Sequence, residues 1–361
     1  MARGKIIGIV LAIIIVGAFG TFFLIGVLTQ GTIEASGSRY YNPSIASDPE
    51  PVVIRTDLGN INIKYNTTAT PFFVKVDYDV KVSGTYMIGK SFSDFLALEW
   101  HNLTSDDKTV FYLKTRPDIW IDPSTWFSVK RIEIDVILRT DIPYAIEVYA
   151  TTGNVETTIP KNSNVDSLYI ETTTGNSITT LEELSIGSFQ VEATTGNPSI
   201  YAKKVNLTSG IIVDATTGNI RLNLTNCLLG GNINAEVITG NLHFDSYNIR
   251  ITGDLKWDLD ATTGDIHCNI VQKVELGGKI QGNWEVTTGN INIDYLDTLS
   301  TVGASFSGTI TTGNFNPTNS GGFEVIGTTA FRSLDYGSAN YTYILDLTTT
   351  TGNINIDGQS S

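Results

Sequence analysis

The most constraining feature of this chain is a short turn, Thr-Gly-Asn, that returns at a nearly constant interval. Its glycines are separated by 22, 21, 22, 22, 24, 25, 24 and 39 residues, and only one copy replaces the asparagine, with Asp265. A period in the low twenties is typical of solenoid coils. The glycines are Gly153, Gly175, Gly196, Gly218, Gly240, Gly264, Gly289, Gly313 and Gly352.

The turn and its flanks predict stacked strands. Glycine supplies a positive φ without steric cost, and asparagine tolerates the adjoining turn conformation. Apolar and polar residues alternate on both sides of the turn, so Trp284, Val286, Ile291 and Ile293 should point inward. Thr hydroxyls and Asn amides of stacked turns, about 4.8 Å apart, would hydrogen-bond along the stack. We therefore predict a parallel β-helix; an antiparallel sandwich with Thr-Gly-Asn hairpins is the alternative.

Between Gly59 and Gly153 the repeat is lost for 94 residues. Residues 58–63 read as a first coil, and alternating stretches at 73–78 and 131–136 read as antiparallel strands that cap it. The expected organisation is a cytoplasmic tail (1–5), a transmembrane helix (6–28), a flexible stalk (29–50), an N-terminal β cap with the first coil (51–150) and a β-solenoid (151–361).

The transmembrane helix is expected from 23 uncharged residues between Ile6 and Leu28, because a bilayer needs about 20. Arg3 and Lys5 precede the run, which keeps the N-terminus cytoplasmic and the rest extracellular. Two alternatives remain: a cleaved secretory signal with small residues at 18–20, and an archaeal pilin-like signal cut before Lys5. We expect an uncleaved, single-pass anchor in the cell membrane.

These features resemble the putative adhesin family of bacterial and archaeal surface proteins, often catalogued as a domain of unknown function. The resemblance covers residues 51–361 and lies in the Gly-Asn-Ile-Asn-Ile element at 59–63, the strand-rich interval and the serial Thr-Thr-Gly-Asn turns from Thr151. It implies a right-handed parallel β-helix and no known catalytic residues. The expected fold class is thus all-β, a right-handed β-solenoid with an N-terminal antiparallel β insertion, plus one N-terminal transmembrane α-helix.

An acidic residue stands four positions before the glycine in six consecutive coils. Like charges about 4.8 Å apart in water repel by roughly 0.9 kcal/mol per pair. We expect the row to project outward, either to bind divalent cations such as Ca²⁺ or a cationic partner, or as a plain solvated face. These residues, termed the acidic row, are Glu171, Glu192, Asp214, Glu236, Asp260 and Glu285.

Two other pairs of residues, one of histidines and one of cysteines, are candidate sites. His243 and His267 share an offset in consecutive coils and should stack, either as a two-imidazole metal clamp or as an exposed ladder. Cys227 and Cys268 lie two coils apart, about 9.6 Å, which is too far for a disulfide. Both cysteines should be buried small hydrophobes.

Five Asn-x-Ser/Thr sequons are candidate glycosylation sites if the chain is outside the cell. They begin at Asn66, Asn102, Asn206, Asn223 and Asn340.

The composition and the motifs favour a non-catalytic role. A net charge of −14 disfavours nucleic acid, and no phosphate-loop or nucleophile motif occurs. We expect a membrane-anchored surface module for adhesion or envelope structure, with an extracellular protein or glycan as partner. A glycan-binding or glycan-degrading β-helix and an envelope sensor are the alternatives. Only a short tail follows the final turn at Gly352, which predicts end-to-end self-association.

Overall fold

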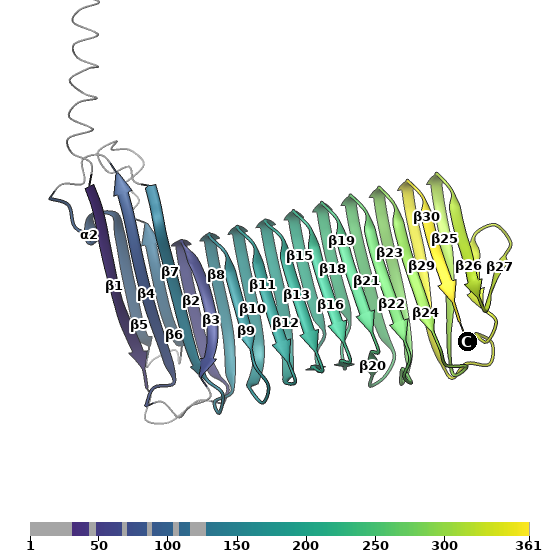
Figure 1. Ribbon diagram of the computed structural model, residues 1–361, viewed down its shortest axis with the longest axis horizontal. Coiled ribbons are helices and arrows are strands. Elements are labelled where there is room, and N and C mark those ends of the chain that lie inside the picture. Colours follow the sequence, from purple (N-terminus) through teal and green to yellow (C-terminus); the bar gives the residue numbers. More distant parts are fainter. Residues whose placement is uncertain are drawn as a thin grey trace, which may run out of the picture.

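The computed structural model describes residues 31–42, 48–66, 71–84, 89–103, 108–115 and 128–360. These residues form two long facing sheets that run the length of the molecule (Figure 1). In spatial order, sheet A contains β1 (Gly31–Tyr41), β4 (Val74–Gly84), β7 (Ser128–Arg139), β3 (Asn60–Asn66), β9 (Val155–Ile159), β11 (Ser177–Glu182), β13 (Pro198–Lys203), β16 (Ile220–Thr225), β19 (Leu242–Tyr247), β22 (Ile266–Gln272), β24 (Ile291–Asp297), β30 (Ile354–Gln359) and β26 (Phe315–Gly321).

Sheet B faces sheet A and is built in the same way. Its long strands are, in spatial order, β5 (Leu96–Leu103), β6 (Lys108–Thr115), β2 (Glu50–Leu58), β8 (Tyr144–Thr152), β10 (Asn164–Thr174), β12 (Ser185–Thr195), β15 (Ile211–Thr217), β18 (Ile233–Thr239), β21 (Leu255–Thr263), β23 (Lys279–Thr288), β29 (Tyr341–Thr351), β25 (Val302–Thr312), β28 (Ala330–Ser333) and β27 (Phe323–Ile326). The short strands β14 (Asn206–Leu207), β17 (Leu228–Leu229) and β20 (Arg250–Ile251) add a third stack beside it, and the one-turn helix α2 (Phe92–Phe95) precedes β5.

The predicted turn joins sheet B to sheet A in every coil. At Gly218 the chain has φ of 137°, and its backbone N donates to Thr239 O of the next coil at 2.9 Å. The asparagines form a ladder, in which Asn219 N donates to Asn197 Oδ1 and Asn241 N donates to Asn219 Oδ1, both at 2.9 Å. Each side chain therefore satisfies a backbone donor that the turn would otherwise leave unpaired.

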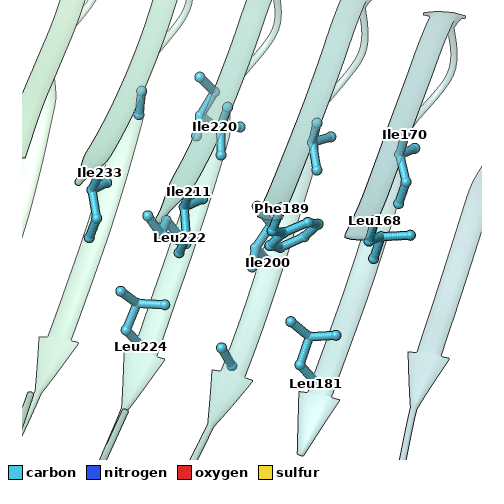
Figure 2. Close-up of a cluster of buried hydrophobic side chains, with 14 of the residues drawn as sticks. Leu168, Ile170, Leu181, Phe189, Ile200, Ile211, Ile220, Leu222, Leu224 and Ile233 are labelled. Carbon is cyan, nitrogen blue, oxygen red and sulfur yellow. The ribbon is translucent and has the colours of Figure 1, made fainter. Parts of the chain in front are cut away.

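The core lies between the two sheets and is formed by every second residue of their strands (Figure 2). In the coil of β15 and β16, Ile211, Ile220, Leu222 and Leu224 are at most 1% exposed. The four residues expected to point inward, Trp284, Val286, Ile291 and Ile293, are buried to the same degree, so this prediction is confirmed.

A second turn returns the chain from sheet A to sheet B. It uses non-glycine residues with φ between 52° and 63°, spaced like the coils themselves. Asparagine often adopts this left-handed conformation, whereas lysine and glutamate adopt it with a cost in conformational free energy. The turn residues are Asn162, Glu183, Lys204, Asn226 and Asn248.

The N-terminal end is capped much as expected. β4 and β7 are antiparallel to each other, and β7 joins the first coil by pairing in parallel with β3. On sheet B, the hairpin of β5 and β6 attaches to β2. Gly59 N donates to Thr152 O at 2.9 Å, so the coil of β2 and β3 is indeed the first of the stack.

The predicted flexible stalk over 29–50 was wrong for its described part. Residues 31–41 form β1, which is antiparallel to β4 along its whole length and includes an ion pair between Glu34 and Lys81. Gly37 fits under the ring of Tyr78, where a Cβ would lie 2.6 Å from the Tyr78 hydroxyl oxygen. The small residues of this segment therefore serve close strand packing rather than mobility.

The predicted fold class also needs correction in its membrane helix. Among the described residues, none belongs to a helix with the length and apolar character required to cross a bilayer. The run from Ile6 to Leu28 on which the prediction rested lies outside the described residues. The fold that the structure supports is all-β, with stacked parallel sheets.

The C-terminal coil does not occupy the end of the stack. β29 pairs with β23 on one side and with β25 on the other, and β30 lies between β24 and β26. In Figure 1 the yellow β29 and β30 accordingly lie inside the yellow-green β25 and β26. The interval of 39 residues marks a chain that skips one level, builds the outer coil and the hairpin of β27 and β28, and then returns to fill the gap. The last coil in sequence is therefore not the end coil of the stack, and end-to-end self-association stays a prediction.

Candidate functional site: the acidic row on sheet B

The six carboxylates predicted to form a row do so. Strand register aligns them directly, because each is the Cα partner of the next across β10, β12, β15, β18, β21 and β23. Neighbouring positions on each strand are buried, whereas the acids are half-buried or exposed. Parallel pairing therefore holds one carboxyl group per coil on the outer face of sheet B, about 4.8 Å apart.

The same line continues beyond the acids in both directions. Glu171 is paired with Tyr149, and Tyr149 with Arg55, while at the other end Glu285 is paired with Thr348. Sequence reasoning missed Arg55 and Tyr149, although they stand four residues before Gly59 and Gly153, the same offset as the acids. The row thus changes from acidic to aromatic and basic at its N-terminal end.

A surface hollow of about 340 Å³ lies along the row. Glu171, Glu192, Asp214 and Glu236 line it, together with short side chains and Ile238. Two of the carboxylates are fixed from their own strands: Tyr169 Oη donates to Glu171 Oε2 at 3.0 Å, and Gln190 Nε2 donates to Glu192 Oε1 at 2.6 Å. The hollow is therefore an elongated acidic trough rather than an enclosed pocket.

A second hollow, of about 220 Å³, adjoins the first and shares Glu171 with it. The Arg55 guanidinium lies 4.5 Å from the centre of the Tyr149 ring, close enough for a cation–π contact. On its far side, Tyr112 Oη donates to Asp57 Oδ1 at 2.8 Å and Thr115 N donates to Asp57 Oδ2 at 2.7 Å. These contacts hold a basic and two aromatic side chains in fixed positions at the end of the acidic trough.

Burial and the closeness of neighbouring carboxylates raise the pKa of two aspartates in the row. Burial, followed by the charges of Glu236 and Glu192, raises the pKa of Asp214. Burial raises the pKa of Asp260 to about 6, and the charges of neighbouring carboxylates, Glu285 first, add to the shift. Asp260 Oδ1 is buried without a hydrogen-bond partner among the described residues. Repulsion within the row therefore adds to the effect of burial at these two aspartates.

We expect Asp260→Asn to stabilise the protein at pH 7. The pKa of Asp260 in the folded state lies above its unfolded value of about 3.9. The protonated carboxyl group therefore contributes its full stability below about pH 4, and this contribution is lost as the pH rises through about 6. After discounting for the solvent exposure of this half-buried group, the gain at pH 7 is about 1 kcal/mol. Denaturant unfolding at pH 7 and pH 4 measures it. Asp294→Asn, on an exposed residue of sheet A, is the control, and an equal gain at both pH values would contradict the assignment.

Binding of Ca²⁺ by the acidic row stays a prediction. In the parts of the chain that the structure describes, no three His, Cys, Asp or Glu side chains are grouped closely enough to hold a metal ion. The row offers ligands as neighbouring pairs, which would bind weakly. At an affinity of about 1 mM, ~10 mM Ca²⁺ would stabilise the fold by about 1.4 kcal/mol, a rise in Tm of a few degrees. Thermal melts in chelator and in Ca²⁺ measure this, and an unchanged Tm would contradict the cation role.

The two histidines stack as predicted. The rings of His243 and His267 are 5.0 Å apart at 9°, and their line continues to Arg221 on one side and Asn292 on the other. Burial, followed by the charges of His267 and Arg221, lowers the pKa of His243. This arrangement is an aromatic ladder on sheet A, and the two neighbouring coils offer Arg221 and Asn292 at the same offset rather than a carboxylate or a thiol.

The cysteines are free and buried, as expected. Cys227 and Cys268 are 1% and 4% exposed, and burial raises the pKa of both thiols. They fill the core as small apolar groups.

The sequons differ in accessibility. Asn340 is exposed, and Asn66, Asn206 and Asn223 are half-buried. The side chain of Asn102 lies outside the described residues. Their glycosylation stays a prediction.

Comparison with known proteins gives no family. No family model matches the chain, and no curated protein matches it. Among solved structures, it is similar to a "putative cell adhesion protein" from Clostridium sporogenes, at 13% identity and a TM-score of 0.25, covering 90% of this chain and all of that one.

Two further solved structures are described as "putative adhesin". That of Bacteroides fragilis has 11% identity and a TM-score of 0.32, covering 90% of this chain and 97% of that one. That of Parabacteroides distasonis has 11% identity and a TM-score of 0.29, covering 90% and 96%. The names agree with the resemblance expected from the sequence, but likeness at this level carries no argument about the function of this chain.

Proposed function

We propose that this protein is a non-catalytic adhesion or structural module of the cell surface, and that the outer face of sheet B is its working surface. The observation that carries the proposal is the unbroken line of outward side chains, one per coil, from Arg55 to Glu285. Parallel strands fix the spacing of this line, so it suits a partner that is itself extended or repetitive. Two hollows that share Glu171 make the face a trough along which such a partner would lie.

The charge of the trough indicates the chemistry of the partner. Burial first, and then repulsion from neighbouring carboxylates, raises the pKa of Asp214 and Asp260, and positive groups placed between the carboxylates would relieve the repulsion. An extracellular protein that presents lysine or arginine side chains along a strand or a helix meets this requirement. Electrostatic attraction would also speed its association, with strong dependence on ionic strength.

A second candidate function is glycan binding at the N-terminal end of the trough. It is favoured by the hollow in which Arg55, Tyr112 and Tyr149 lie beside carboxylates that are already hydrogen-bonded. Fixed aromatic and polar groups bind with little loss of side-chain entropy. In this role the acids beyond Glu171 would flank the glycan site rather than form it.

Binding of the purified, fluorescently labelled protein to whole cells and to a glycan array tests the proposal. The adhesive role predicts binding that weakens as salt is raised from 50 to 500 mM, because the trough acts through charge. The glycan role predicts binding to particular array members that is lost in Tyr149→Ala and retained when acids beyond Glu171 are neutralised. Absence of binding to cells and glycans at every salt concentration would overturn both.

A further inference from the structure

The C-terminal coil fills a slot between two coils that both precede it in the chain. β23 and β24 form one wall, and β25 and β26 form the other, all of them from residues before 322. β29 pairs in parallel with both walls of sheet B, from Thr342 beside Lys279 to Thr351 beside Thr312. β30 does the same in sheet A, and the yellow coil is seen between its neighbours in Figure 1.

The slot is shaped for this particular segment. Gly282 of β23 leaves room for Leu345, since a Cβ there would lie 2.6 Å from Leu345 Cδ2. Tyr343 Oη donates to Gln272 Oε1 at 3.1 Å inside the core. Five apolar side chains of the segment enter the core and are at most 1% exposed, namely Tyr343, Leu345, Leu347, Ile354 and Ile356.

Only a short surface turn ties the segment to the hairpin before it. Residues 334–340 connect β28 to β29, with Leu334 68% exposed and space around Gly337 for an added side chain. Thr301 O accepts from both Asn340 N and Tyr341 N, at 3.1 and 3.0 Å, where the turn ends. The strands make most of the contacts that hold the segment, while the turn is tied to the hairpin through Leu334 N, which donates to Gly322 O at 2.9 Å.

The open edge of the stack is a poor alternative contact for a second molecule. Ile354 N donates to Asn314 O at 3.0 Å, so the alternation of β26 puts the nitrogen of Pro317 on the free side. Proline there cannot donate to an added strand and is a common protection of sheet edges. On sheet B, the hairpin of β27 and β28 already pairs with residues 305–307 on the free side of β25.

We propose that residues 341–360 are an exchangeable segment, and that the slot of one molecule accepts this segment from a second copy of the chain, which receives the reciprocal one. Exchange preserves every strand contact of the segment and alters only the turn at 334–340, which is why it is a low-cost route to a dimer. The product joins two solenoids through their C-terminal ends and leaves both β1 ends apart. The inference goes beyond the proposed function, because the slot lies at the C-terminal end of the stack and not in the acidic trough.

A pair of engineered thiols reports exchange directly. Thr309 of β25 and Thr348 of β29 are Cα partners on the outer face, at a strand spacing of about 4.8 Å that a disulfide can bridge. In the double variant Thr309→Cys/Thr348→Cys, oxidation links the segment to its own molecule if no exchange has taken place. After exchange, the same oxidation links two molecules covalently.

The double variant is warmed under reducing conditions to just below its unfolding midpoint, cooled, oxidised and run on a non-reducing gel. We expect a covalent dimer whose share rises at least fivefold between 10 µM and 500 µM protein, on the order expected for a bimolecular step, and no dimer when oxidation precedes warming. Thr348→Cys alone controls for links through the natural cysteines. Monomer alone at every concentration, or as much dimer in the single variant, would overturn the proposal.

The monomer oxidised before warming distinguishes this proposal from the proposed adhesive function. If that locked monomer binds cells while the gel shows no exchange, the adhesive function stands and exchange is rejected. If exchange takes place on the gel but neither form binds cells or glycans, the segment exchanges and the adhesive function is rejected.

Discussion

Gly218→Ala should prevent the solenoid from folding. The residue has φ of 137°, and an added Cβ would lie 1.7 Å from Gly196 O and 2.7 Å from Gly196 C in the coil stacked against it. Neither atom can move away, because both belong to the backbone of the adjacent turn. Strain at positive φ and this overlap together should cost more than about 4 kcal/mol, at the extreme of single substitutions. Soluble yield and the far-ultraviolet circular dichroism spectrum of the variant measure the effect.

Gly253→Ala is the matched control for this substitution. A Cβ at Gly253 meets nothing within 4 Å, and this glycine does not have the positive φ of the turns. The control should fold and melt within about 0.5 kcal/mol of the natural protein. A folded Gly218→Ala protein with similar stability would mean that the stacked glycines do not set the coil geometry.

Leu347→Asp should release the last three structural units of the chain together. Leu347 is 1% exposed and lies on β29, which pairs with both β23 and β25. A carboxylate buried there without a partner should cost more than about 4 kcal/mol, so the inserted coil would leave its slot. Without it, β25, β26 and the hairpin of β27 and β28 lose the strands that join them to the stack. Hydrogen exchange followed by mass spectrometry should show lost protection from residue 302 to the C-terminus.

The order of the coils decides how far that loss extends. If the coils stacked in chain order, loss of β29 and β30 would leave residues 302–333 protected, because they would still rest on β23 and β24. Thr350→Asp places the same charge on the exposed side of the same strand and should leave protection unchanged. Retained protection of residues 302–333 in Leu347→Asp would contradict the inserted position of the C-terminal coil.

Much of the fold could be predicted because its period is local. Most of the Thr-Gly-Asn turns require glycine for φ, the asparagines form the ladder, and alternation around the turn identifies core residues such as Trp284 and Ile293. The position of the C-terminal coil could not be predicted in this way. Successive coils carry similar turns and similar alternation of apolar and polar residues. The sequence around Gly352 therefore fits equally well on either side of the coil that contains Gly313. The choice depends on side-chain fit across coils, such as that of Leu345 over Gly282.

Other features were missed for different reasons. β1 has the small and polar residues of a linker, and its order comes from pairing with β4, a contact that composition does not reveal. The second turn of each coil carries lysine or glutamate at some levels, as at Lys204 and Glu183, so it lacks the glycine that marks such turns. In both cases tertiary pairing overrides the local preference of the residues.

The candidate site was predicted in its acidic part only. Counting back from each glycine locates the six acids correctly, since offset from the turn fixes both strand position and face. Arg55 and Tyr149 stand at the same offset from their glycines. They were missed because they do not share the negative charge that defines the acidic row. The raised pKa of Asp260 could not be read from the sequence, because it depends first on how far burial removes the carboxylate from water.

A matched pair of triple variants in the cell-binding assay tests most directly whether the acidic trough is the working surface. Glu192→Gln/Asp214→Asn/Glu236→Gln removes three charges from the trough. Glu156→Gln/Glu275→Gln/Asp294→Asn removes three from exposed positions elsewhere, with the same change in net charge. We expect at least a tenfold loss of affinity in the first variant, about 1.4 kcal/mol, and a change of less than twofold in the second. Equal affinities in the two variants would contradict this role of the trough.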